Sequence, residues 1–296
     1  MSTSAAPPPP QPHPPSGLPS PKPLTHNPTH THLLLCATGS VATIKLPLII
    51  TALSHHPALS IRLILTPSAT TFLAGQSAEQ PSLASIAALP NVDGVYTDED
   101  EWKTPWTRGA KILHIELRRW ADLMVIAPLS ANSLAKIVGG WAEGLVCSVV
   151  RAWDTRGEID AVRLPLRAGE AGGLESAASG GRESGSWGEG LMGGGVEATG
   201  DGRVDDGGRR RKKKAILVAP AMNTAMWKHP ITAQHMRVLE EEWNVSQGGW
   251  FEVLSPMQKE LACGDTGDGA MKDWKEIVLL IEERLGLAAS TNGAGG

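Results

Sequence analysis

Four apolar runs of strand length are spaced along the chain, and each of them ends in small or polar residues. Because no run alternates with polar residues along its length, the pattern predicts strands that are buried on both faces of a sheet. The runs are HLLLCATG (32–39), IRLILTPS (61–68), ADLMVIAPLS (121–130) and AILVAPAMN (215–223).

Helical patterns follow three of these runs closely. They cover residues 41–54, 131–150 and 230–243, and Pro230 suits the first turn of the last helix. Repeated alternation of strand and helix predicts an α/β fold with a parallel sheet flanked by helices on both faces. Ligands of such sheets bind at the carboxyl ends of the strands.

Polar clusters stand where the predicted strands end. If the clusters lie side by side, the backbone N–H groups and helix N-termini around them suit a phosphate or another anion. The alternative is that they are ordinary helix caps and turn formers. No G-x-G-x-x-G follows the first strand and no G-K-[ST] loop is present, so the usual dinucleotide and P-loop motifs are not supported. The clusters are Thr38-Gly39-Ser40, Thr66-Pro67-Ser68, Ser130-Ala131-Asn132-Ser133 and Ala221-Met222-Asn223.

Composition divides the rest of the 296-residue chain. Residues 1–28 are rich in Pro, Ser, Thr and His and predict a disordered tail, and residues 287–296 predict a second flexible tail. One domain is expected over 29–286, interrupted at 157–213 by a Gly-rich low-complexity insertion. The basic run at 209–214 is interpreted as a solvated linker end, with a nuclear-localisation signal as the alternative.

Charge and cysteine usage restrict the class of protein. The net charge of −4 says little about partners, and we expect neither nucleic acid nor a membrane among them. No secretory signal and no run of about 18 apolar residues is present, and the three cysteines are an odd number spaced far apart. These features predict a cytoplasmic protein without a disulfide framework. We expect no bound metal.

Long motifs carry a resemblance to a known family. The chain is similar to the phosphopantothenoylcysteine decarboxylases, which belong to the homo-oligomeric flavin-containing cysteine decarboxylases and include halotolerance-type proteins. The resemblance implies a single Rossmann-like (flavodoxin-like) domain, FMN as cofactor, and decarboxylation of 4'-phospho-N-pantothenoylcysteine to 4'-phosphopantetheine in coenzyme A biosynthesis. It also implies a homotrimer, or a heterotrimer with paralogues, whose sites lie between subunits. The motifs are ATGSVATIK (37–45), YTDEDEW (96–102), HIELRRWADLMVIAPLSANSLAKIVGG (114–140), RAWD (151–154), APAMNTAMW (219–227) and LACGDTGDGAM (261–271).

The resemblance assigns catalytic roles to His114, Asn223 and Cys263. Flavin oxidises the carbon that carries the sulfur, which gives the departing carboxylate an electron sink. His114 is expected to take the thiol proton, Asn223 to hold the carboxylate without a stabilising charge, and Cys263 to protonate the product. The alternatives from the residues alone are a structural histidine, a turn-forming asparagine and an inert buried thiol, and we assign the last to Cys36 and Cys147.

The resemblance also assigns the binding residues. Substrate contacts fall on Asn223, Glu260, Leu261 and Ala262, and Glu260 departs from the Arg of some relatives. The FMN contacts fall on Gly39, Ser40, Val41, Thr66, Ser68, Ser130, Ala131, Asn132, Ser133 and Ala221.

Two rival functions stay open. Some halotolerance-type relatives bind and inhibit the catalytic subunit of a Ser/Thr protein phosphatase, but they typically carry an acidic C-terminal tail that this sequence lacks. A decarboxylase of C-terminal peptide cysteines is the other. Because His114, Asn223 and Cys263 are all present, the enzyme of the coenzyme A branch is favoured.

Overall fold

The computed structural model describes residues 18–160, 213–260 and 266–287. Its centre is a parallel sheet of six strands in the order β5-β2-β1-β6-β7-β8. The order reverses between β1 and β6, which makes this the doubly wound Rossmann arrangement, with its switch point between those two strands. The strands are β1 (Thr31–Ala37), β2 (Leu59–Leu65), β5 (Val92–Tyr96), β6 (Leu123–Leu129), β7 (Ile216–Pro220) and β8 (Phe251–Val253).

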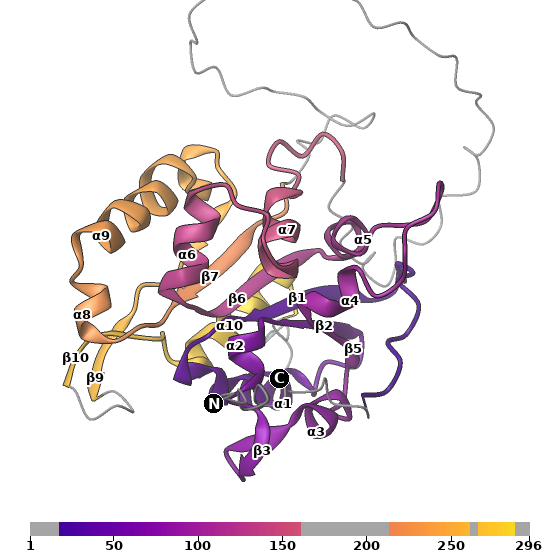
Figure 1. Cartoon of the computed structure of the whole chain (residues 1–296), viewed down its shortest axis with the longest axis horizontal. Coiled ribbons are helices and arrows are strands. Elements are labelled where there is room, and N and C mark those ends of the chain that lie inside the picture. The colour runs from indigo at the N-terminus through magenta and orange to yellow at the C-terminus, as the bar shows by residue number, and fades with distance from the viewer. Residues whose placement is uncertain (1–17, 161–212, 261–265, 288–296) are drawn as a thin grey trace, which may run out of the picture.

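Helices cover both faces of the sheet, as the sequence predicts, and Figure 1 shows the two layers above and below it. One layer contains α1 (Leu46–Leu53), α3 (Leu83–Ala87) and α10 (Trp274–Leu285). The other contains α5 (Leu113–Trp120), α6 (Ala131–Val138), α7 (Leu145–Arg151) and α9 (Pro230–Arg237). Shorter helices are α2 (Pro67–Thr70), α4 (Asp98–Glu101) and α8 (Thr224–Trp227), and two hairpins pair β3 (Ala74–Ser77) with β4 (Gln80–Ser82) and β9 (Met257–Glu260) with β10 (Thr266–Ala270).

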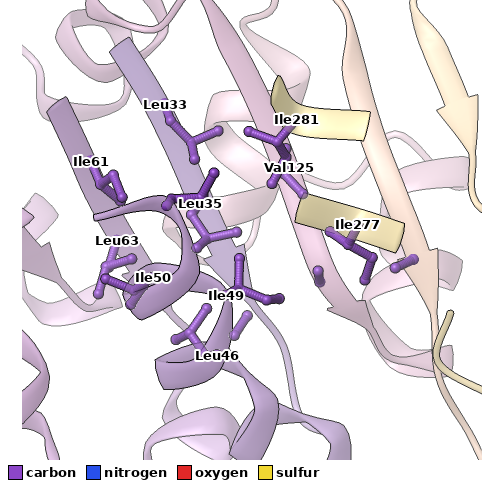
Figure 2. Packing of buried hydrophobic residues seen from close by; sticks show 14 of the residues in the cluster. Leu33, Leu35, Leu46, Ile49, Ile50, Ile61, Leu63, Val125, Ile277 and Ile281 are labelled. Carbon is purple, nitrogen blue, oxygen red and sulfur yellow. The ribbon is translucent and has the colours of Figure 1, made fainter. Parts of the chain in front are cut away.

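Alternate residues of the central strands supply two separate cores. Leu33 and Leu35 of β1 point to the α1 and α10 side, where Ile49 and Ile277 pack near them (Figure 2). Leu34 and Cys36 point to the opposite face. All seven residues of β1 are buried, which explains why this strand reads as a continuous apolar run.

The predicted helix over 131–150 is wrong as one element. It is two helices, α6 and α7, separated by Gly139, Gly140 and Gly144. Gly140 and Gly144 have φ of +73° and +82°, in the left-handed region where a side chain is strained, so the helix cannot continue through them. The predicted helix over 41–54 begins as a 3₁₀ turn (Val41–Lys45) before α1, and the one over 230–243 ends in a π turn (Val238–Glu242).

The predicted tail at 1–28 needs a correction at its end. Residues 1–17 lie outside the described residues, but residues 18–28 pack on the domain. Arg62, which is buried in β2, donates from Nη2 to the carbonyl oxygens of Lys22 and Pro23 at 2.9 and 2.8 Å. Lys22 Nζ lies 2.6 Å from Asp93 Oδ1. The segment just before β1 is therefore part of the fold.

Both ends of the predicted insertion at 157–213 also belong to the domain. Asp160 is buried, and its Oδ2 lies 2.9 Å from Arg118 Nε and 3.8 Å from Lys214 Nζ. Lys214 is likewise buried, so the last residue of the predicted basic run is not a solvated linker end. Residues 161–212, with the rest of that run up to position 212, lie outside the described residues, as do residues 288–296 of the predicted C-terminal tail.

Within the described residues, no helix is long and apolar enough to cross a lipid bilayer.

Candidate active site

The carboxyl ends of β1, β6 and β7 are tied together by short hydrogen bonds. Thr38, after β1, donates from Oγ1 to the carbonyl oxygen of Pro128 at 3.0 Å and accepts from the N–H of Ser130 at 2.7 Å. Ala221, after β7, donates its N–H to the carbonyl oxygen of Leu129 at 2.9 Å. These bonds place the clusters that follow the strands side by side at one edge of the sheet, as the sequence predicts.

Gly39 brings the loop after β1 against the loop after β2. A Cβ atom at Gly39 would lie 2.3 Å from Ser68 Oγ and 2.7 Å from Ser68 Cβ, which is closer than non-bonded atoms can approach. The backbone of Gly39 therefore packs directly against the side chain of Ser68, and any residue other than glycine would clash there. Ser40 and Val41 follow at the surface, where Val41 is exposed.

A cavity of about 330 Å³ opens between the loops after β2 and β6. Four of the residues assigned to FMN line it: Thr66, Ser68, Asn132 and Ser133. The remaining lining residues are Pro67, Asp98, Lys136, Glu143, Gly144, Val146 and Cys147.

Hydroxyl groups cap the two helices that begin at this cavity. Ser130 Oγ accepts from the N–H of Ser133 at 3.3 Å at the start of α6, and Thr66 Oγ1 accepts from the N–H of Ala69 at 3.3 Å at the start of α2. Other N–H groups in the first turn of α6, including those of Ala131 and Asn132, have no partner within the helix, because no turn precedes them. The cap interpretation is therefore correct for Thr66 and Ser130, and N–H donors still remain for an anion.

The donors around the cavity fit a flavin nucleotide phosphate. Three lining residues carry hydroxyl groups, and the one cation of the lining, Lys136, has its Nζ 2.8 Å from Glu143 Oε2. That hydrogen bond raises the pKa of Lys136 although burial opposes it. Asp98 is also engaged, because its Oδ1 accepts from the N–H of Leu145 at 2.7 Å. A phosphate would thus be held mainly by neutral donors and by the α6 N-terminus.

Asn223 stands directly after β7 and caps the short helix α8. Its Oδ1 accepts from the N–H of Met226 at 2.8 Å, so the turn-forming role is real. The side chain is exposed, and among the described residues its Nδ2 has no hydrogen-bond partner. Because one end of the amide holds the helix, the donor end is left for a ligand carboxylate. Ala221, two residues earlier, is buried beside it.

His114 lies in the first turn of α5, and a glutamate holds it. Its Nδ1 is 2.9 Å from Oε1 of Glu101, whose side chain is 4% exposed. A carboxylate can only accept a hydrogen bond, so Nδ1 carries the proton and Nε2 is left as the basic nitrogen. Glu101 stands in the motif YTDEDEW, but the sequence alone gives no role for it. No spacing rule links a residue in one short helix to a histidine 13 positions later.

The structure does not bring all the predicted catalytic residues together within one chain. His114 is in α5 and Asn223 precedes α8, and these helices lie on opposite sides of the molecule in Figure 1. Glu260 is the last residue of β9, in the hairpin β9–β10. Gly269 of the same hairpin accepts the N–H of Met222 at its carbonyl oxygen, which places the hairpin beside Asn223. Leu261, Ala262 and Cys263 lie outside the described residues.

The two described cysteines are inert by environment, as the sequence predicts. Cys36 and Cys147 are free and buried. Burial raises the pKa of Cys36 strongly, and it raises the pKa of Cys147 to about 11 although Lys136 opposes the shift. Neither thiol is a reactive thiolate near neutral pH.

Comparisons with known proteins agree with this geometry. A family model described as Flavoprotein matches residues 21–162 and 207–286. A probable phosphopantothenoylcysteine decarboxylase of Arabidopsis thaliana is 34% identical over 242 residues, which are 81% of this chain and 82% of the relative. A 33% identical match, covering 86% of this chain, is to a Schizosaccharomyces pombe protein named probable thymidylate synthase, of which the chain spans only 29%.

Solved structures show the same fold. A mutant of PPC decarboxylase complexed with pantothenoylaminoethenethiol aligns with a TM-score of 0.55 and 30% identity, over 86% of this chain and 97% of that one. The FMN binding protein AtHal3 aligns with a TM-score of 0.54 and 31% identity, over 86% and 95% of the two chains. The chain therefore belongs to the flavoprotein family, among the phosphopantothenoylcysteine decarboxylases.

Proposed function

We propose that the chain is an FMN-dependent phosphopantothenoylcysteine decarboxylase that releases CO2 and forms 4'-phosphopantetheine for coenzyme A synthesis. The observation that carries this proposal is a cavity at the carboxyl edge of the sheet that is lined by the clusters after β2 and β6, in a chain of this family. Relatives with the decarboxylase name align over most of both chains, which supports the same reaction here.

The FMN phosphate would be held by the loops after β1, β2 and β6. Thr66, Ser68 and Ser133 supply hydroxyl groups, and the first turn of α6 supplies N–H donors. The close approach of Gly39 to Ser68 brings its backbone to the same place. Bound FMN supplies reversible two-electron oxidation of the substrate carbon that carries the thiol, which makes loss of CO2 feasible.

His114 would remove the proton of the substrate thiol. Glu101 holds the ring by Nδ1, so the lone pair of Nε2 is available as the base. When the ring takes up the proton, the adjacent carboxylate stabilises the imidazolium that forms. The substrate sulfur is left as the more easily oxidised thiolate.

Asn223 would hold the carboxylate that leaves. Its Nδ2 donates to the carboxylate while its Oδ1 stays on the N–H of Met226, so the group is fixed in orientation. A neutral donor positions the carboxylate without the strong ground-state stabilisation that a cation would give, and that stabilisation would slow CO2 loss.

A complete site would require a second copy of the chain. His114 and Asn223 lie on opposite sides of one chain, so a single molecule does not place the base and the carboxylate donor on one small substrate. A homotrimer, in which α5 of one subunit faces the α8 region of the next, resolves this separation. A heterotrimer with paralogues satisfies the same geometry.

The Cys263→Ser variant tests the proposed reaction. Serine is a much weaker acid than cysteine, so the last protonation should fail after CO2 has left. We expect mass spectrometry to detect an enethiol product that is lighter than 4'-phosphopantetheine by two hydrogens. Wild-type amounts of 4'-phosphopantetheine would contradict the role of Cys263, whereas absence of CO2 release from the wild-type protein would contradict the proposed function itself.

A further inference from the structure

We propose a divalent metal site formed by His55, His56 and Glu282, at a place that the decarboxylase reaction does not use. His55 and His56 follow the C-terminus of α1, and Glu282 lies in the last turn of α10. The three ligand atoms of this His-His-Glu site lie within 4.8 Å of one another. The site joins two segments that are 226 residues apart in the sequence.

One carboxylate oxygen faces both imidazole rings. Glu282 Oε1 lies 2.8 Å from His56 Nε2 and 3.4 Å from His55 Nε2. The side chains of His56 and Glu282 are 14% and 13% exposed, whereas that of His55 is 62% exposed. The site therefore has two half-buried ligands that are held in place and one ligand at the open side, where an ion can enter.

The Nδ1 atom of His55 already makes a hydrogen bond, which leaves Nε2 of the same ring as the ligand atom. Nδ1 lies 2.5 Å from the carbonyl oxygen of Ala52. A carbonyl can only accept, so Nδ1 carries the hydrogen, and in the neutral ring Nε2 holds a lone pair. Metal-binding histidines are oriented by this arrangement, in which the second ring nitrogen donates to a carbonyl or carboxylate.

The lone pair of His55 Nε2 then points toward a carboxylate oxygen at 3.4 Å. Two acceptors face one another there, and a cation between them would remove the repulsion. The ion pairs of Glu282 among the described residues are with these two histidines, so no lysine or arginine supplies that positive charge in the described part of the chain. The imidazole rings are 3.8 Å apart between centroids, so they lie beside one another where both contact Glu282.

The spacing fits a first-row transition metal. Zinc binds histidine nitrogen at about 2.0–2.1 Å and carboxylate oxygen at about 2.0–2.2 Å, so tetrahedral ligand atoms lie roughly 3.3–3.5 Å apart. The distance from His55 Nε2 to Glu282 Oε1 already matches, whereas His56 has to withdraw by about 0.5 Å from its 2.8 Å contact. His56 Nε2 also has to give up the hydrogen that it donates to Glu282, and the neutral ring then carries its hydrogen on Nδ1. Two imidazoles and one carboxylate suit Zn²⁺, and exclude Ca²⁺ and Mg²⁺, which prefer oxygen ligands. Water would complete the coordination.

A bound ion would fasten α10 to the end of α1. Both helices pack on the same face of the sheet, with Ile49 of α1 and Ile277 of α10 in one core (Figure 2). An ion that binds only the folded chain stabilises it by mass action. We assign the site a structural role in holding the C-terminal helix.

Zinc binding is measured on the full chain, purified without a histidine tag and stripped with a chelator, by competition with a chromophoric zinc indicator. We expect one tight zinc ion per chain and a rise in melting temperature of roughly 5 °C or more at about 100-fold excess over Kd. His55→Ala and Glu282→Gln should each lower the zinc affinity by at least about 10-fold. Both should leave flavin binding and CO2 release unchanged, which separates this test from that of the proposed function.

The matched control is His26→Gln, in a second group of potential ligands among the described residues, formed by His26, His32 and Asp122. It should bind zinc with unchanged affinity. Equal zinc affinity in wild type, His55→Ala and Glu282→Gln would overturn the proposal, and so would a loss of binding in His26→Gln alone. Failure of the wild-type chain to retain any zinc would overturn it as well.

Discussion

At the scale of single residues, polar groups after the strands cap helices and still leave hydrogen-bond donors for a ligand. Asn223 caps α8 with its oxygen and keeps a donor free, and Ser130 caps α6 whose first turn keeps N–H donors. The cap interpretation of these residues is therefore correct, and it is compatible with a ligand site, because a ligand would use a different atom. A test of function at such a residue has to preserve the cap.

Asn223→Asp preserves the cap and removes the donor. Aspartate accepts the N–H of Met226 as asparagine does, but it repels the substrate carboxylate. We expect kcat/KM to fall by at least about 100-fold, while the melting temperature stays within about 2 °C of wild type. Asn223→Ser is the matched control for charge: it keeps a cap without the repulsion and should lose less activity than the aspartate variant.

Glu101→Gln tests the positioning of His114. A glutamine keeps the shape of the side chain but holds no charge beside the imidazolium that forms during proton transfer. We expect kcat to fall by about 10- to 100-fold with little change in KM, because the side chain of Glu101 is buried behind His114 and only 4% exposed. Unchanged kcat would mean that the contact of 2.9 Å between Glu101 and His114 is only structural.

At the scale of elements, the sequence predicts the interior of the sheet better than its edges. The runs that form β1, β2, β6 and β7 are buried along their whole length and stand out as apolar. The edge strands β5 (VDGVY) and β8 (FEV) are short and half-buried, so their hydrophobic patterns are too weak to predict strands. The end of α6 depends on the backbone conformation of Gly140, which the apolar pattern does not report.

The site residues likewise divide into those that the sequence predicts and those that it does not. The strand-end clusters are predictable because parallel strands bring their carboxyl ends to one edge. The pairing of Glu101 with His114 and the grouping of His55 with Glu282 are not, because they depend on how separate helices pack. The expectation of no metal follows from the same limit, since Glu282 stands 226 positions after His56 in the chain.

The buried end of the Gly-rich insertion at Asp160 leads to a prediction about stability. Asp160→Ala would leave Arg118, which is buried in α5, without its carboxylate partner at 2.9 Å. We expect a loss of about 3 kcal/mol in the free energy of unfolding, measured by urea denaturation. The neighbouring Ile159→Ala removes a side chain that is 68% exposed and should change stability by less than about 0.5 kcal/mol. Equal stability of both variants would show that the ion pair does not anchor the insertion.

A deletion of the insertion should begin after Asp160 and end before Lys214, because both residues are buried in the domain. Removal of residues 162–211 keeps Asp160 and Lys214, whose charged atoms lie 3.8 Å apart, and joins the chain between them. A deletion that starts at 158 removes Asp160 and the N–H groups of Glu158 and Ile159, which donate hydrogen bonds to the carboxylate of Asp154.

The same N–H donors affect the titration of Asp154. Although burial opposes them, they hold the pKa of Asp154 below its usual value. Their contribution to the free energy of unfolding is fully present above the ordinary pKa of an aspartate, about 4, and it is lost as the pH falls through the lowered pKa.

At the scale of the whole molecule, the separation of His114 from Asn223 leads to a mixing experiment. If each site takes its base from one chain and its carboxylate donor from another, two inactive variants can complement one another. We expect refolded mixtures of His114→Ala and Asn223→Asp chains to regain a fraction of the wild-type activity that neither variant has alone. No recovery, with mixed trimers demonstrated by mass spectrometry, would show that the complete site lies within one chain.

The central claim is that FMN bound at the strand-end clusters enables this chain to decarboxylate 4'-phospho-N-pantothenoylcysteine. The most direct measurement combines the flavin absorbance of the purified protein with release of labelled CO2 from that substrate, before and after removal of the flavin. We predict about one FMN per chain, CO2 release by the loaded protein, loss of activity in the flavin-free protein and recovery on addition of FMN. A flavin-free protein that still releases CO2, or a flavin-loaded protein that releases none, would contradict the account.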